Sequence, residues 1–112
     1  MRIHSYVSSG GKDFIMDYIS SLQRDEKIDG LSVLEDLEND RLETLWTKRW
    51  RGKIWEVYFR KHHRIFYIIV AGEDIYLLHA CKKQKNKTEK KDEKLIIKRA
   101  KELENSLHIK LI

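Results

Sequence analysis

The stretch IWEVYFRKHHRIFYIIVAGEDIYLLHAC, residues 54–81, decides the fold of this chain. It contains three runs rich in aromatic and β-branched residues, at 54–60, 64–70 and 75–81. Such residues favour the pleated, half-buried surface of a sheet. The short polar segments between the runs are typical of turns that join neighbouring antiparallel strands. Because residues 45–50 precede these runs with a similar composition, the sequence predicts an antiparallel meander of three or four strands.

Helices are expected on both sides of this meander in the sequence. Apolar residues recur at helical three-and-four spacing over about 12–24, from about 25 to 40, and again up to about 107. Residues 2–7 read as a short first strand that ends in a Ser and Gly turn. The predicted order is β-α-α-β-β-β-α in a single domain over 1–112. This is an α+β fold, with two N-terminal helices and a C-terminal helix packed on one face of an antiparallel sheet.

Composition narrows the class of partner. The 112 residues give room for one domain with one modest core. Lys and Arg number 23 against 18 Asp and Glu, and the resulting net charge of +5 favours an anionic partner, with nucleic acid as the leading candidate.

Cysteine usage and hydropathy indicate where the protein works. The single Cys81 cannot form an internal disulfide, and Cys and His do not occur at metal-ligand spacing. We therefore expect a reducing compartment, the cytoplasm, and no metal or other cofactor. Since no apolar run approaches the roughly 20 residues that a membrane helix needs, and the N-terminus lacks the apolar core of a signal peptide, membrane insertion and secretion are not expected.

One face of the first run carries polar side chains. Strand alternation places Glu56, Tyr58 and Arg60 on one face and the residues between them on the core face. The polar face can hold phosphates and stack a base. Arg64 opens the next strand, where a hairpin would bring it near Arg60. The same charges are also typical of a solvated sheet surface.

Cleaving RNA without a metal requires a base for the 2′-OH proton, cations for the charge on phosphorus, and an acid for the leaving 5′ oxygen. Glu56, His79 or a lysine with a lowered pKa could exchange these protons. The expected phosphate-binding side chains are Arg49, Arg60, Arg64, Lys82, Lys83 and Lys85. A lone histidine near a strand end is more often a packing or hydrogen-bonding residue than a catalyst. His62 and His63 are expected to be solvated in a hairpin turn.

Six lysines crowd into residues 82–91, KKQKNKTEKK. Beside a sheet face with arginines, the ammonium groups of this run, Lys87 included, form an electrostatic landing site for a polyanion. The alternative is a solvated loop that keeps a small basic protein soluble.

Three segments resemble one family. IYLLHACKKQKNKT at 75–88 resembles the signature LLHAF-KK-xx-K-TP of the phage Gp49-like branch of the RelE/ParE toxin superfamily, which includes the HigB-type toxins. GKIWEV at 52–57 and RIFY at 64–67 resemble the G-x-LWEL-R and RI-x-Y strands of that branch. The element order agrees, so the resemblance covers roughly residues 1–105 and is strongest over 45–100.

The chain departs from this pattern at three positions. Cys81 replaces the usual aromatic residue, and Glu89 stands where proline is common. Tyr58 occupies a position that more often carries an arginine, for which Arg60 could substitute. The third departure weakens the transfer of a catalytic arginine from the family to this chain.

The resemblance implies a RelE-like toxin of a two-gene toxin–antitoxin module. Such a toxin cleaves mRNA in the ribosomal A site without metal, gives a 2′,3′-cyclic phosphate, and is silenced by a helix-turn-helix antitoxin of the HigA type in a heterotetramer. The motif match points to Arg64, His79, Lys82, Lys83 and Lys85, with Lys53 and Glu56 less firmly placed. The expected catalytic set is Glu56, Arg60, Arg64, His79 and Lys82, and the expected RNA-binding set is Arg49, Lys53, Tyr58, Lys83, Lys85 and Lys87.

Two other functions fit the same fold. One is a ParE-like inhibitor that binds a DNA gyrase subunit and cleaves nothing, although His79 and the lysine run count against it. The other is an inactive phage-derived binding protein, which the tyrosine at position 58 keeps open. Trp46, Trp50 and Trp55 are expected in the core or at an antitoxin contact, and Tyr58 and Tyr76 are the better candidates for base stacking.

Overall fold

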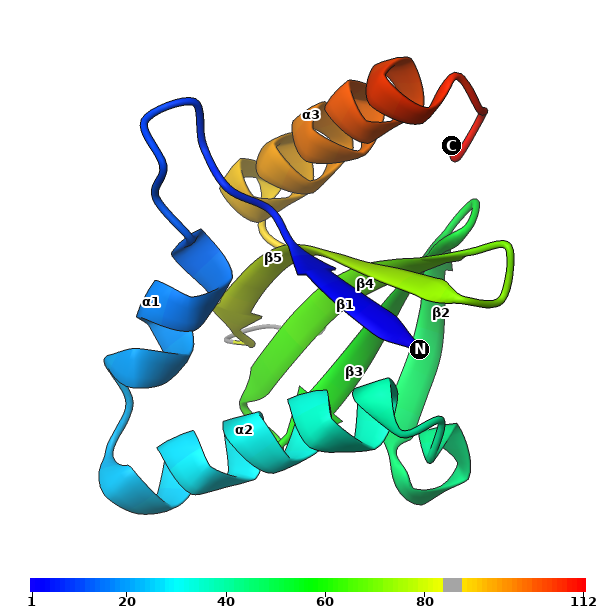
Figure 1. The fold of residues 1–112 in the computed structure, drawn as a ribbon. Coiled ribbons are helices and arrows are strands. Elements are labelled where there is room, and N and C mark those ends of the chain that lie inside the picture. Colours follow the sequence, from blue (N-terminus) through cyan, green and yellow to red (C-terminus); the bar gives the residue numbers. More distant parts are fainter. Residues whose placement is uncertain (84–87) are drawn as a thin grey trace.

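A computed structural model describes residues 1–83 and 88–112 (Figure 1). The described residues form five strands and three α-helices, which confirms the α+β class. In chain order the elements are β1 Arg2–Ser5, α1 Phe14–Ser20, α2 Arg24–Glu38, the 3-10 turn η1 Leu42–Thr44, β2 Trp46–Arg51, β3 Ile54–Phe59, β4 His63–Val70, β5 Asp74–Lys82 and α3 Lys90–Leu107.

The strands form one sheet in the order β1-β5-β4-β3-β2. Strands β2 to β5 make the expected antiparallel meander, in its four-stranded form. The prediction of a wholly antiparallel sheet is wrong, because β1 pairs parallel to β5. The predicted order with three strands after the helices is also one strand short, since residues 46–51 form a strand of their own.

The helices cover both faces of the sheet, so the prediction that they share one face is wrong. Figure 1 shows α1 and α2 on one side of the strands and α3 on the other. Ile15, Ile19 and Leu37 pack on the first face, while Ile96 and Ala100 pack on the second. The physical reason is that β4 and β5 are nearly continuous apolar runs, as in strands that are buried on both sides.

Caps and packing set the bounds of the helices. Helix α1 is shorter than the expected 12–24, because the Asp13 side chain accepts a hydrogen bond from the Met16 backbone N–H at 3.0 Å and so caps a helix that begins at Phe14. Helix α2 and the end of α3 lie close to their predicted positions. None of these helices in the described residues is long and apolar enough to cross a membrane.

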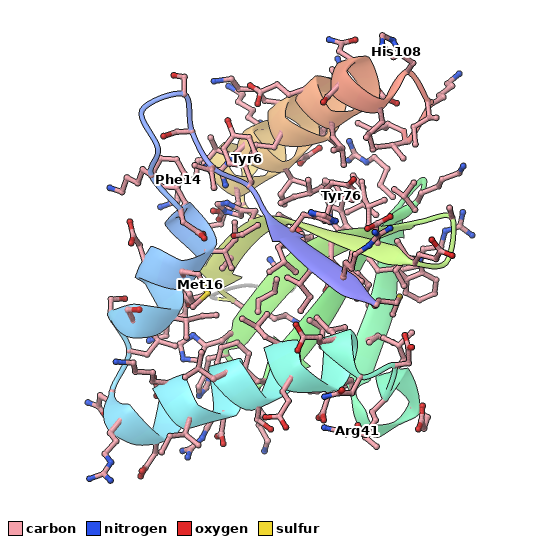
Figure 2. The ribbon with its side chains drawn as sticks, in the orientation of Figure 1. Tyr6, Phe14, Met16, Arg41, Tyr76 and His108 are labelled. Carbon is pink, nitrogen blue, oxygen red and sulfur yellow. The ribbon has the colours of Figure 1, made fainter. Side chains whose placement is uncertain are left out.

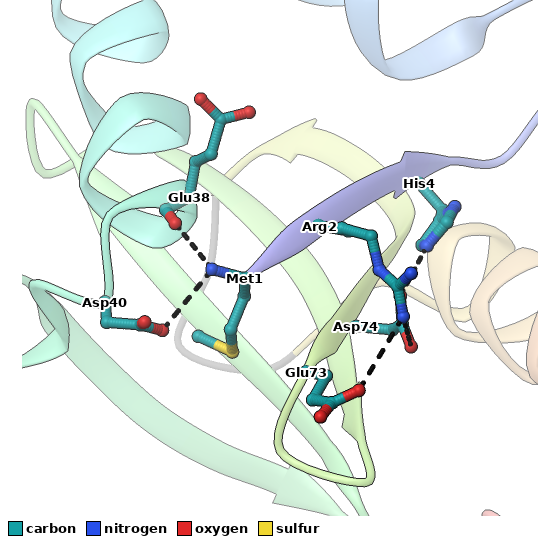
Figure 3. A network of polar contacts seen from close by, with 7 residues as sticks. All are labelled: Met1, Arg2, His4, Glu38, Asp40, Glu73 and Asp74. Atoms are coloured by element: carbon teal, nitrogen blue, oxygen red, sulfur yellow. Dashed lines mark hydrogen bonds and ion pairs between the residues drawn. The ribbon is translucent and has the colours of Figure 1, made fainter.

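Polar contacts fix β1 at the edge of the sheet (Figure 3). The Arg2 guanidinium and the His4 imidazole both contact the Asp74 carboxylate, Arg2 at 3.0 Å and His4 at 2.8 Å. The Met1 amino group donates to the Glu38 carbonyl oxygen at 2.6 Å. These contacts tie the first residues to both β5 and the end of α2, and so fix the parallel register of β1.

Candidate active site

A pocket of about 290 Å³ lies on the α3 side of the sheet, over β2, β3 and β4. The strand register builds it, since Lys48 lies opposite Glu56 and Tyr58 lies opposite Arg64. The segment that enters α3 closes one side. The lining residues are Lys48, Trp50, Arg51, Glu56, Tyr58, Arg64, Thr88 and Glu93. Alternation along β3 thus places Glu56 and Tyr58 on one face, as the sequence predicts.

Glu56 and Arg64 form a buried ion pair at the floor of this pocket. The two residues are only 2% and 3% exposed, and Arg64 Nη1 lies 3.5 Å from Glu56 Oε1. The Tyr58 hydroxyl also donates a hydrogen bond to Glu56. Arg64 Nε has no hydrogen-bond partner, and within residues 1–83 and 88–112 it is the one buried side-chain nitrogen or oxygen in this condition. The floor therefore holds a carboxylate beside a guanidinium with one N–H unused, and that N–H could donate to an oxygen of an anion.

Burial raises the pKa of Glu56, while the positive charges of Arg64, Lys48 and Lys83 act in the opposite direction. A carboxyl with a raised pKa is a better proton acceptor than an ordinary surface carboxylate. The same three cations would attract a phosphate toward the carboxyl. The site thus combines a candidate base with groups that can stabilise negative charge.

Two lysines, Lys83 and Lys48, add positive charge to the site beyond the pocket floor. The Lys83 ammonium lies 5.0 Å from the centre of the Tyr58 ring, and the Lys83 backbone N–H donates to the His62 carbonyl oxygen. Lys48 lines the pocket but was not among the predicted site residues. It lies two residues before Trp50, on the same face of β2, and this alternation could have identified it.

The structure separates Arg60 from this site. Strand β3 ends at Phe59, and Arg60 and Lys61 have left-handed backbone conformations, with φ of 54° and 62°. The Arg60 guanidinium pairs with Asp29 of α2. The prediction that Arg60 shares a face with Glu56 is therefore wrong, because the turn begins at Arg60 itself and ends the alternation of β3.

Three further predicted residues lie away from the pocket. Arg49 pairs with Trp55 in the register, on the sheet face opposite Lys48 and Glu56, and its side chain donates to the Gly52 carbonyl oxygen at 2.9 Å. Lys53 lies in the β2–β3 turn. Lys82 pairs with His63 at the end of β5 and alternates toward the face of α1 and α2.

The structure describes four of the six lysines of the run. Lys85 and Lys87 lie outside the described residues. Lys82 and Lys83 are described and follow Cys81 directly. Lys83 approaches the site, and Lys82 does not.

His79 is buried between β5 and α3. Its Nε2 lies 2.8 Å from the Asp92 carboxylate, and its Nδ1 lies 3.0 Å from the Arg99 guanidinium. Since an arginine can only donate, Nδ1 accepts and the proton sits on Nε2. Burial lowers the pKa of His79, and the hydrogen bond to Asp92 opposes that shift. With both nitrogens engaged, His79 ties β5 to α3 and does not line the pocket.

Aromatic rings hold the other side of Arg99. Its guanidinium lies 4.6 Å from the Tyr6 ring and 4.9 Å from the Phe14 ring, two residues that Figure 2 shows beside the start of α3. Arg99 also donates to the Leu78 carbonyl oxygen at 2.9 Å. The arginine is thus fixed in place, which in turn fixes His79.

His79, Cys81 and Asp92 place one potential metal-ligand atom each within 4.8 Å of one another. The 10 residues between Cys81 and Asp92 hid this cluster from the sequence. The His79–Asp92 hydrogen bond already accounts for two of its members, and burial raises the pKa of the Cys81 thiol to about 11. A neutral thiol and a histidine that accepts from Arg99 are poorly suited to hold a cation.

His63 is the clearest residue that the sequence interpretation misplaced. It is 3% exposed instead of solvated, and its Nδ1 lies 2.6 Å from the Tyr18 hydroxyl of α1. Its Nε2 lies 3.0 Å from the Glu26 carboxylate of α2. His63 therefore joins both helices to β4 directly before Arg64.

The comparison with family models identifies the family of this chain. No curated protein matches the chain. The family model described as phage derived protein Gp49-like matches residues 17–101 and so includes every described residue that lines the pocket. The resemblance seen in the sequence is confirmed, and the chain belongs to this phage-derived Gp49-like family, that of the Gp49/HigB-like toxins.

Proposed function

We propose that this protein is the toxin of a type II toxin–antitoxin module and acts as a ribosome-dependent mRNA endoribonuclease. The observation that carries the proposal is the buried Glu56–Arg64 pair, with a free Nε donor on the arginine, in a pocket that Lys48 also lines. Family membership supports the toxin role. A polar pocket of this kind has no evident use in a protein that only inhibits gyrase by binding.

The proposed reaction is attack of a ribose 2′-OH on the adjacent phosphorus. Ionised Glu56 takes the proton from the 2′-OH, and the bond from phosphorus to the 5′ oxygen breaks to leave a 2′,3′-cyclic phosphate. Arg64 stabilises the negative charge that develops on the phosphoryl oxygens. The leaving 5′ oxygen takes a proton from an ammonium group, that of Lys48 or Lys83. No step of this scheme needs a metal.

The burial of the pair also fits a need for the ribosome. Both residues line the pocket although each is at most 3% exposed, so a phosphate meets them only at the floor. A flexible RNA strand would have to present one phosphate there in a defined orientation. The ribosomal A site holds an mRNA codon in a defined conformation, and productive orientation alone can lower a barrier substantially.

The proposed partners are the ribosome with its mRNA and a helix-turn-helix antitoxin of the HigA type in a heterotetramer. Net charge of +5 suits attraction to ribosomal RNA as well as to mRNA. The antitoxin follows from the family, because a toxin of this class needs an inhibitor during normal growth.

The test is primer-extension mapping of an mRNA on translating ribosomes. We expect codon-aligned cuts with the wild type and none with Arg64→Ala. Arg41→Ala is the control and should cut like the wild type, because the Arg41 guanidinium pairs with Asp36 of α2 and does not line the pocket. Arg64→Ala cutting like the wild type would contradict the proposal. Gyrase supercoiling measured without ribosomes separates the alternative, since inhibition there with no mRNA cuts would favour a ParE-like function.

A further inference from the structure

One tryptophan stands exposed beside the candidate site. Trp46 is the first residue of β2, one of the two edge strands of the sheet, and 61% of its surface is exposed. It lies opposite Tyr58 in the register, and the two ring centres are 4.8 Å apart with an angle of 32° between the planes. One part of the indole is therefore supported by Tyr58, while the rest faces solvent at the rim of the pocket.

Two lysines lie in the neighbourhood of this indole. Lys48 lies two residues further along β2, on the same face, and lines the pocket. The Lys83 ammonium lies near the Tyr58 ring that supports Trp46. An exposed aromatic ring beside ammonium groups is the combination with which proteins bind single-stranded nucleic acid, because bases stack on the ring while cations hold the backbone.

We propose that Trp46 is the platform on which a nucleobase next to the scissile phosphate stacks. The inference rests on the proposed function for its substrate and adds a specific binding subsite to it. A phosphate at Arg64 occupies the pocket floor, so the bases on either side of it must lie toward the rim. The tilt of Tyr58 against Trp46 holds the indole in place, which lowers the entropic cost of stacking a base on it.

An exposed tryptophan can also contact a second protein, since tryptophan is frequent at the hot spots of protein interfaces. The charge of the neighbourhood favours RNA. Trp55 offers a matched comparison, because it is also exposed, at 38%, yet pairs with Arg49 on the opposite face of the sheet.

The experiment measures binding without cleavage. The probe is a dye-labelled, 2′-O-methylated single-stranded hexanucleotide at low salt, which lacks the attacking hydroxyl, together with the same chain built from abasic residues. We expect Trp46→Ala to weaken binding of the hexanucleotide about ten-fold, and Trp46→Phe to retain most of the affinity. Trp55→Ala should bind like the wild type. The abasic chain should bind the wild type and Trp46→Ala equally.

Fluorescence gives an independent readout. RNA should quench tryptophan emission in the wild type and in Trp55→Ala, and the quenching should disappear in Trp46→Phe. Thermal unfolding should show that Trp46→Ala melts within a few degrees of Trp55→Ala, as expected for exposed residues.

Several outcomes would overturn the inference. These are absence of binding by the wild type, wild-type binding by Trp46→Ala, an equal loss of affinity for the abasic chain, or weaker binding of the helix-turn-helix antitoxin with unchanged RNA binding. The last would assign Trp46 to a protein interface. Failure of the nuclease proposal looks different, because codon-aligned cuts would then be missing while base-dependent binding to Trp46 persists.

Discussion

Arg64 and Glu56 face each other across β4 and β3, 3.5 Å apart and almost fully buried, yet the arginine keeps one N–H unused. A buried guanidinium donor without a partner costs free energy, on the order of 1–3 kcal/mol. Folding therefore leaves this buried Nε donor without an acceptor among the described residues. A phosphate oxygen is such an acceptor, and its arrival would compensate the cost at the point where the proposed reaction develops charge.

The forked shape of Arg64 should matter as much as its charge. Arg64→Lys keeps one positive charge but cannot donate from two directions to a phosphate and to Glu56. We expect single-turnover cleavage of ribosome-bound mRNA to fall about 100-fold or more with Arg64→Lys. Thermal unfolding checks that the variant is folded. Wild-type rates for a folded Arg64→Lys would show that only a point charge is needed.

Glu56 should give cleavage an acidic limb. Because burial raises the pKa of Glu56 above its ordinary value of about 4.3, the proton-accepting carboxylate is lost as the pH falls through this raised pKa. We expect the single-turnover rate to decline over that range in the wild type. Glu56→Gln, which keeps the shape without the base, should be slower by about 100-fold or more and lack this limb. Persistence of the same acidic limb in Glu56→Gln would assign it to another group.

His79 should serve stability more than catalysis. Its pKa is lowered in the folded protein, so the unfolded chain binds the proton more tightly, and the free energy of unfolding should fall as the pH drops below about 6.5. His79→Ala leaves the buried Asp92 and Arg99 without their shared partner and should cost about 2–4 kcal/mol in urea unfolding. The acid-induced loss specific to His79 should be absent from this variant.

The control for His79 is cleavage at a temperature where the variant remains folded. There we expect His79→Ala to retain far more activity than Arg64→Lys, since His79 does not line the pocket. A loss of rate as large as that of the arginine variant would return His79 to the catalytic set.

The sequence predicted the features that depend on residues close together in the chain, such as strand faces and short turns. The alternation of β3 placed Glu56 and Tyr58 together, and the short turns fixed β3, β4 and β5 as neighbours. The same alternation failed at Arg60, because where a strand ends depends on the turn that follows it. The unbroken apolar run of β4 was a signal that both faces are buried, which could have placed α3 opposite the other helices.

Contacts between distant segments could not be predicted in this way. His63 meets Tyr18 and Glu26, which lie 45 and 37 residues away, and its burial follows only from the docking of α1 and α2. The parallel pairing of β1 with β5 likewise depends on contacts that span the whole chain. Around the pocket, the sequence pattern had already singled out Glu56, Tyr58, Arg64 and Lys83, while Lys48 and the exposed Trp46 drew attention only through the strand register.

Gly52, in the turn between β2 and β3, should contribute to stability for a reason separate from its backbone angle. Its φ is 56°, and a Cβ added there would lie 2.9 Å from the Leu111 carbonyl oxygen. That carbonyl accepts a hydrogen bond from the Lys53 backbone N–H at 3.1 Å, and the Leu111 side chain is 2% exposed against the α3 face of the sheet. A side chain at position 52 would therefore push the C-terminal segment away from the core.

Gly72 provides the matched control. Its φ is 71°, but an added Cβ would meet nothing within 4 Å. Both alanine variants carry the strain of a left-handed alanine, about 1–2 kcal/mol. We expect Gly72→Ala to lose about that much in urea unfolding, and Gly52→Ala to lose about 1–3 kcal/mol more from the clash. In a chain shortened to end at Lys110 the two losses should become equal, because the clashing carbonyl is gone. Equal losses in the full chain would contradict the close packing of Leu111 on Gly52.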